Sequence, residues 1–173
     1  MVPGEYAEMR SVSVRAFGGD EAIGSLLDSL RRSWSWADDL AFVAEAECGL
    51  VGQILYTQAR LDTIRGVVPV LLLSPLGVVP EHQTAGLGER LVRDSLTMLR
   101  GRPESLVFLE GHPGYYPRFG FRCARDLGFA PPSIRIPDPA FQVLMLPSWQ
   151  PWMIGALVYP DAYWEHNAVV PAS

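Results

Sequence analysis

A strand, a glycine turn and a helix follow one another within residues 67–100, and this succession constrains the fold more than any other feature. Val67–Val79 is long and apolar, as is typical of a central strand covered on both faces. Pro75 and Gly77 lie inside it, so we expect a bulged or frayed ladder there. From about 86 to 100, apolar and polar residues separate onto two sides at helical spacing. The apolar side holds Leu87, Leu91, Val92, Leu96, Met98 and Leu99.

The remaining elements surround this unit on both sides. Residues 8–17 alternate weakly and predict a first strand, and Asp20 is placed to cap a helix over about 20–33. Leu40–Glu47 and Val51–Leu61 flank a Cys48-Gly49 turn and predict a hairpin. After the long helix we expect a strand at Ser105–Glu110, a helical turn at Pro113–Arg118, and strands at Phe119–Arg125 and Phe141–Leu146. The predicted class is mixed α/β.

Length and composition favour one globular domain. With 173 residues, of which 49% are hydrophobic and 19% charged, the chain has enough apolar material for a core. We expect a single domain over residues 1–173, with the motifs in 8–125 and a part rich in proline and aromatic residues in 126–173. No run of 18 apolar residues and no signal peptide are found, so we expect no membrane partner and a cytoplasmic location.

Charge and metal-ligand spacing exclude two classes of function. The net charge of −5 argues against nucleic acid as a partner and weakly favours a cationic substrate such as an amine. Cys48 and Cys123 lack metal-ligand spacing, and His82, His112 and His166 form no ligand cluster. We therefore expect reduced thiols and no metal.

The turn before the long helix has the features of an anion site. It reads Gln83-Thr84-Ala85-Gly86-Leu87-Gly88, and its glycines let the backbone approach a bulky group. The first amides of a helix lack intrahelical partners, and the helix dipole favours negative charge there. Such a turn suits a pyrophosphate. Neither GK[ST] nor GxGxxG is present, so the better-known nucleotide loops are excluded.

Two blocks of this sequence resemble the GNAT superfamily of N-acyltransferases. The turn matches the family's acyl-CoA pattern Q/R-x-x-G-x-G/A, and residues 111–121 (GHPGYYPRFGF) resemble the YYxRFGF signature of a bacterial branch of YhbS type. The resemblance covers about 8–125, and Val158–Tyr163 looks like that branch's closing segment. It implies a mostly antiparallel central sheet, flanked by helices, with a splayed V between two parallel central strands.

The resemblance also implies a reaction and a cofactor site. The reaction is direct transfer of an acetyl group from acetyl-CoA, as cosubstrate, to a primary amine, with a small-molecule amine as the expected acceptor. Gln83 is expected at the lip of the cofactor site. Backbone contacts to the pantetheine arm are expected from Leu76, Gly77 and Val78, and amide contacts to the pyrophosphate from Thr84, Ala85, Gly86, Leu87, Gly88 and Glu89.

Catalytic groups are expected near the second block. Tyr116 stands where the family has its general-acid tyrosine, with Tyr115 as the structural member of the pair, and the amide near Val78 is expected to stabilise the oxyanion. Glu110, at the end of a strand, is the predicted general base, and Glu45 is the alternative. His112 is interpreted as a turn residue.

Three alternatives stay open at this point. The acceptor could be a protein N-terminus or lysine, the chain could be a catalytically silent acyl-CoA-binding or sensing module, and the acyl group could be longer than acetyl. The apolar, aromatic tail is compatible with a homodimer.

Overall fold

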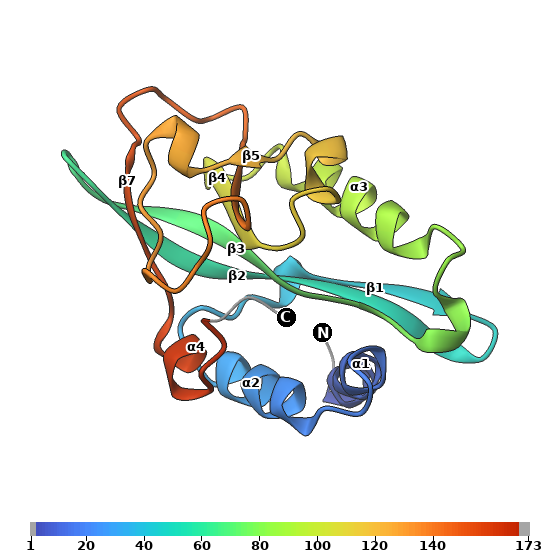
Figure 1. Ribbon diagram of the computed structural model, residues 1–173. Helices are drawn as coiled ribbons and strands as arrows, with labels where there is room; N and C mark the ends of the chain where they lie inside the picture. The colour runs from blue at the N-terminus through green and yellow to red at the C-terminus, as the bar shows by residue number, and fades with distance from the viewer. Residues whose placement is uncertain (1–2, 170–173) are drawn as a thin grey trace. The chain divides into compact units, whose positions relative to one another are not determined.

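The computed structural model describes residues 3–169 and contains four α-helices and seven strands within that range (Figure 1). The chain divides into two compact units: residues up to 57 together with 74–98, and residues 58–73 together with those from 99 onward. In chain order the elements are α1 Pro3–Ala16, α2 Glu21–Arg31, β1 Ala41–Ala46, β2 Gly49–Thr63, β3 Gly66–Val78, α3 Leu87–Leu99, β4 Leu106–Glu110, β5 Arg122–Cys123, β6 Phe141–Met145, β7 Gly155–Val158 and α4 Asp161–Glu165.

The strands form one mixed sheet. Its order is β1-β2-β3-β4-β6-β5, and β7 pairs with β2. The β3/β4 pair is parallel, with Leu71 opposite Val107 and Leu72 opposite Phe108. The pairs β1/β2, β2/β7, β4/β6 and β5/β6 are antiparallel. The predicted class, a mostly antiparallel sheet with one parallel pair and flanking helices, is confirmed.

In the first unit, helices cover both faces of the strands. Val51 of β2 packs with Val12 of α1 on one face. On the other face, the Tyr56 hydroxyl lies 2.8 Å from the Ser95 hydroxyl of α3 in a buried hydrogen bond. Because neighbouring strand residues point to opposite faces, positions of opposite parity in β2 contact different helices. The predicted helices over about 20–33 and 86–100 are confirmed as α2 and α3, and the predicted hairpin as β1 and β2.

The predicted strand over residues 8–17 is wrong, because this segment lies in helix α1. Among its buried residues, Tyr6, Met9 and Val12 follow a spacing of three, and Ser13 beside them is buried as well. The Ser13 hydroxyl donates to the carbonyl of Met9, 3.0 Å away and one turn earlier, so a polar group is accommodated in the packed face. Tertiary packing on a partly polar face overrides the weak alternation of the sequence.

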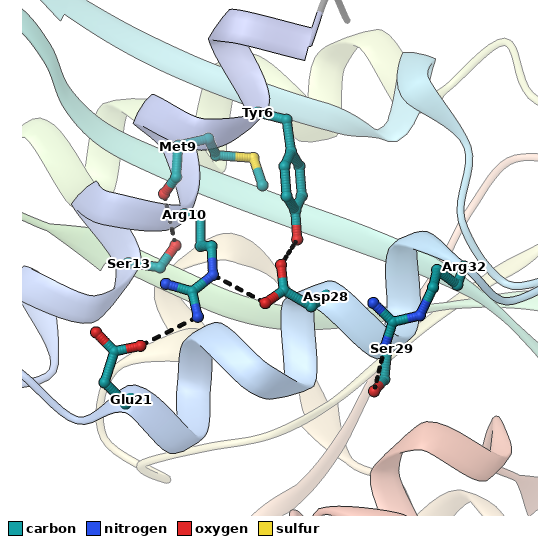
Figure 2. Close-up of polar contacts among 8 residues, drawn as sticks. All are labelled: Tyr6, Met9, Arg10, Ser13, Glu21, Asp28, Ser29 and Arg32. Atoms are coloured by element: carbon teal, nitrogen blue, oxygen red, sulfur yellow. Dashed lines mark hydrogen bonds and ion pairs between the residues drawn. The ribbon is translucent and has the colours of Figure 1, made fainter.

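A polar network joins α1 to α2 (Figure 2). The Tyr6 hydroxyl donates to Asp28 Oδ1 at 2.7 Å, and Arg10 Nε donates to Asp28 Oδ2 at 3.0 Å. Arg10 also donates to Glu21 at 3.0 Å. The Asp20 carboxylate accepts from the amide of Ala22 and caps α2 as expected. Both oxygens of Asp28 are therefore occupied by donors from the neighbouring helix.

Replacing Asp28 with asparagine is expected to lower the free energy of unfolding by about 1–3 kcal/mol at neutral pH. Burial raises the pKa of Asp28, but the hydrogen bonds from Tyr6 and Arg10 outweigh it and leave the pKa below its usual value. A lowered native pKa means that the contribution is present above the unfolded-state pKa and is lost as the pH falls through the native one. Urea unfolding at several pH values measures the difference.

Asp94→Asn is the matched control for this substitution. Asp94 pairs with Arg90 on the surface of α3, where 69% and 80% of the two side chains are exposed. An exposed pair of this kind is expected to change stability by less than about 0.5 kcal/mol. An Asp28 variant no less stable than the Asp94 variant would contradict the role of the network.

In the second unit, aromatic side chains fill the space beside β4. Phe108 stacks on Phe141 of β6 at a centroid distance of 5.6 Å and meets Phe129 edge-on at 5.2 Å. All three rings are buried. These contacts fix β4 and its carboxyl end, where two candidate residues lie.

Several boundaries differ from those predicted. The strand expected at Phe119–Arg125 is only Arg122–Cys123, because Gly120 is left-handed (φ 95°), and the helical turn expected at Pro113–Arg118 is a 3₁₀ turn at Tyr116–Phe119. The long strand expected over Val67–Val79, with a bulged or frayed ladder at Pro75 and Gly77, spans Gly66–Val78. Met98 is 67% exposed instead of packed. β7 and α4 were not predicted.

Candidate functional site

The glycine turn has an unusual backbone. After a 3₁₀ turn at Pro80–His82, Thr84 (φ 68°) and Gly86 (φ 76°) both adopt the left-handed conformation, and α3 begins at Leu87. Threonine rarely adopts a positive φ, because its branched side chain crowds the backbone there. Such residues cluster where the backbone itself contacts a ligand.

The start of α3 presents the backbone amides of its first turn. The first hydrogen bond of the helix runs from the Arg90 amide to the carbonyl of Gly86, at 3.0 Å. The amides of Leu87 and Gly88 precede it, in the first turn, where a helix supplies no acceptor one turn back. Together with the helix dipole, they form a site that suits an anion. The Glu89 side chain pairs with Arg93, 2.8 Å away on the next turn.

At the end of β3, backbone amides point alternately toward β2 and away from it. The Val79 amide donates to the carbonyl of Val51 in β2, at 2.9 Å. Since consecutive residues of a strand direct their amides to opposite edges, Leu76 and Val78 direct theirs away from β2. Gln83 Nε2 donates to the carbonyl of Val78 at 2.9 Å and so ties the turn to the strand. This edge is the one at which the resemblance places the pantetheine arm.

Gly77 allows α1 to approach β3 closely. A Cβ atom at this position would lie 2.9 Å from the Cβ of Ala16. A larger residue would therefore push α1 away from the strand. The glycine serves the packing of the first unit as well as the predicted backbone contact.

Tyr116 lies just beyond the carboxyl end of β4, in the second unit. Its ring packs against Tyr115 and Phe121 at centroid distances of 5.0 and 5.8 Å. It also covers Gly111, where a Cβ atom would collide with the ring. Burial, with a smaller effect of Tyr115, raises the pKa of Tyr116 to about 12. The phenol therefore keeps its proton at neutral pH, as a general acid must.

Glu110 ends β4 in a largely buried position. Its Oε1 accepts a hydrogen bond of 2.5 Å from the hydroxyl of Tyr159. Burial raises the pKa of Glu110 above its usual value, although Tyr159 and the positive charge of Arg135 act to lower it. A carboxylate with a raised pKa is a stronger base, as proton abstraction requires.

The other candidates occupy less specific places. His112 Nδ1 accepts from the amide of Gly114 at 3.1 Å, so its interpretation as a turn residue is confirmed. Glu45 is exposed on β1. Tyr159 and Arg135 were not predicted as site residues, because no sequence signal links positions so far apart. The resemblance of Val158–Tyr163 to the family's closing segment is the one sequence feature that includes Tyr159.

The predicted residues form two groups, one in each compact unit. Leu76–Val78 and Gln83–Glu89 belong to the first unit, and Glu110 and Tyr116 belong to the second. Cys48 and Cys123 are free thiols. Among residues 3–169, no group of three or more metal-ligating side chains is found, and no helix is long and apolar enough to cross a membrane.

Comparison with known proteins places the chain in a family. Residues 3–124 match the family model described as an acetyltransferase (GNAT) domain. The chain is 39% identical over 129 residues to the uncharacterized N-acetyltransferase YjhQ of Escherichia coli (strain K12), covering 74% of this chain and 71% of the relative.

Solved structures agree with this assignment. One is the GNAT family N-acetyltransferase YhbS from Escherichia coli in complex with CoA, with a TM-score of 0.81 and 23% sequence identity. The match covers 94% of this chain and 88% of the YhbS chain. A GNAT family acetyltransferase from Brucella melitensis, in complex with acetyl-CoA, has a TM-score of 0.73 at 28% identity and matches 94% of each chain. The expected resemblance to the YhbS-type branch is confirmed, and the chain belongs to the GNAT family of acetyltransferases.

Proposed function

We propose that this acyltransferase moves an acetyl group from acetyl-CoA directly to the primary amine of a small molecule. The observation that carries the proposal is the turn before α3, with two left-handed residues followed directly by the N-terminus of the helix. This arrangement suits a pyrophosphate. The acetyl-CoA complex of the Brucella melitensis relative supports the choice of cosubstrate.

The proposed cofactor contacts use backbone atoms. Leu76, Gly77 and Val78 line the pantetheine arm, and Gln83 stands at the lip. Thr84, Ala85, Gly86, Leu87, Gly88 and Glu89 direct their amides to the pyrophosphate. The Val79 amide points to β2, so by strand alternation the amides of Leu76 and Val78 point away from β2, which supports their role.

The proposed chemistry divides two proton transfers between two residues. A lysine-like amine has a pKa of ~10.4, so only about one molecule in 10³ is free base at pH 7. Glu110, whose pKa is raised by burial, takes the proton of the amine, and Tyr116 donates one to the departing sulfur. The amide of Val78 donates to the carbonyl oxygen on which charge develops.

A thermal-shift titration tests the cosubstrate, with acetyl-CoA beside free CoA and NAD. A ligand that binds only the native state stabilises it by ~2.7 kcal/mol at a hundredfold excess over Kd. We expect a clear rise in Tm with acetyl-CoA and none with NAD. An unchanged Tm with all three would contradict the proposal. A shift without thiol release from any amine would favour the silent binding module.

A further inference from the structure

A buried hydrogen bond links the carboxyl end of β4 to a residue 49 positions later. The Tyr159 hydroxyl donates to Glu110 Oε1 at 2.5 Å, and the Tyr159 side chain is almost completely buried. No predicted step of the reaction uses Tyr159. Burying a tyrosine against a carboxylate removes both groups from water, a cost that the hydrogen bond between them offsets.

Tyr159 is held in place from its own side of the pair. It directly follows β7, which pairs with β2 from Val158 opposite Arg60 onward. Its ring lies 5.3 Å from that of Tyr163 and 6.4 Å from that of Trp164, both in α4. The position of the hydroxyl therefore does not depend on Glu110.

The backbone around Glu110 is also fixed. Glu110 is paired with Phe141 of β6, and the Gly111 amide donates to the carbonyl of Ala140 at 3.0 Å. Gln142 Nε2 donates to the carbonyl of Gly111 at 3.2 Å. The carboxylate can still rotate about its side-chain bonds, and the contact with Tyr159 selects one orientation.

We propose that Tyr159 is a positioning residue for the acyl transfer, which occupies Oε1 of Glu110 and leaves Oε2 as the oxygen that receives the proton of the amine. The inference rests on the proposed function, because it requires Glu110 to be the base. In the step it serves, the nitrogen–carbon bond forms while the carbon–sulfur bond breaks. The amine proton passes to Oε2, directly or through one water, and the sulfur receives a proton from Tyr116.

The pair has a distinctive pH dependence. The charged or titratable groups around Glu110 are Tyr159 on the segment after β7, Tyr163 behind it in α4, Arg135 on the loop before β6, and Tyr116 beyond Gly111. Burial raises the pKa of Glu110, whereas the hydrogen bond from Tyr159 lowers it. Removing the hydroxyl therefore raises this pKa further. Because a base acts only when deprotonated, the acidic limb of the pH–rate profile moves to higher pH.

The experiment compares kcat/KM against pH for the wild type, Tyr159→Phe, Tyr163→Phe and Glu110→Gln. Tyr159→Phe is expected to lose about tenfold on the acidic side and to return to within about twofold on the alkaline side, the size expected for one hydrogen bond to a charged group. Tyr163→Phe removes a hydroxyl from the neighbouring ring and is expected to leave the acidic limb in place. Carbon-13 NMR of the carboxyl groups, without substrate, follows the titration of Glu110 in the same variants.

Two outcomes separate the inference from the proposed function. If Glu110→Gln is inactive but Tyr159→Phe loses the same factor at every pH, with an unchanged Glu110 titration, Tyr159 is merely structural and the positioning role is wrong. If Glu110→Gln keeps full activity, the base assignment is wrong, and the positioning role is overturned with it. A displaced acidic limb together with a displaced NMR titration supports the inference.

Discussion

Gly86→Glu is expected to raise the Kd for acetyl-CoA by at least about 100-fold, equivalent to a loss of about 2.7 kcal/mol. Gly86 has a φ of 76°, and a side chain in this conformation costs roughly 1–2 kcal/mol. The new carboxylate would also stand at the positive end of α3, in the place proposed for the pyrophosphate. Like charges there oppose binding. Isothermal titration with acetyl-CoA measures the change.

Gly66→Glu is the matched control for the glycine turn. Gly66 also has a positive φ, 116°, and a Cβ atom there would meet no neighbour, as at Gly86. The two variants therefore introduce the same charge and comparable backbone strain. We expect similar losses of stability but normal acetyl-CoA affinity in the Gly66 variant. Equal affinity in both variants would place the cofactor elsewhere.

Tyr116→Phe is expected to lower kcat by about 10²–10³, within the range of general acid catalysis. The ring would keep its contacts with Tyr115 and Phe121 and its place over Gly111, so only the hydroxyl is lost. Because burial raises the pKa of Tyr116 to about 12, the wild-type phenol is protonated throughout the usual assay range. Its ionisation should therefore produce no alkaline limb below about pH 11.

Steady-state kinetics with thiol detection measures the effect, with Tyr115→Phe as the control. Tyr115 belongs to the same aromatic cluster, and Arg118 lies 4.9 Å from its ring centroid. We expect the control to keep kcat within about threefold and both variants to keep their Tm and acetyl-CoA affinity. A Tyr116→Phe variant with wild-type kcat would remove the general-acid role.

The sequence was most informative where one element carries its own signal. The apolar residues of α3 repeat at helical spacing, and the glycines of the turn precede them, so both the helix and the candidate anion site could be predicted. Helix α1 lacked such a signal, because Arg10 and Ser13 lie within or beside its packed face. Its helical state depends on packing against α2 and β2, which local sequence does not specify.

The catalytic candidates were predictable only as single residues. Tyr116 and Glu110 stand in or beside a recognisable block, whereas the partner of Glu110 comes from a segment in which no strand or helix was predicted. Residues 155–158 form strand β7 because their backbone pairs with the carboxyl end of β2. Pairing between distant strands depends on register and closure of the whole chain, so Tyr159 could not be linked to Glu110 from sequence alone.

The strand order of the second unit has a consequence for the biosynthesis of the enzyme. β6 lies between β4 and β5, although β5 precedes it in the chain. During translation, residues 122–123 therefore emerge before the strand with which they pair, and they must wait for residues 141–145. The hydrogen bond from Tyr159 to Glu110 forms later still. A nascent chain would therefore complete the turn before α3 before Tyr159 emerges, so the contact proposed to orient the Glu110 carboxylate would form after the candidate anion site.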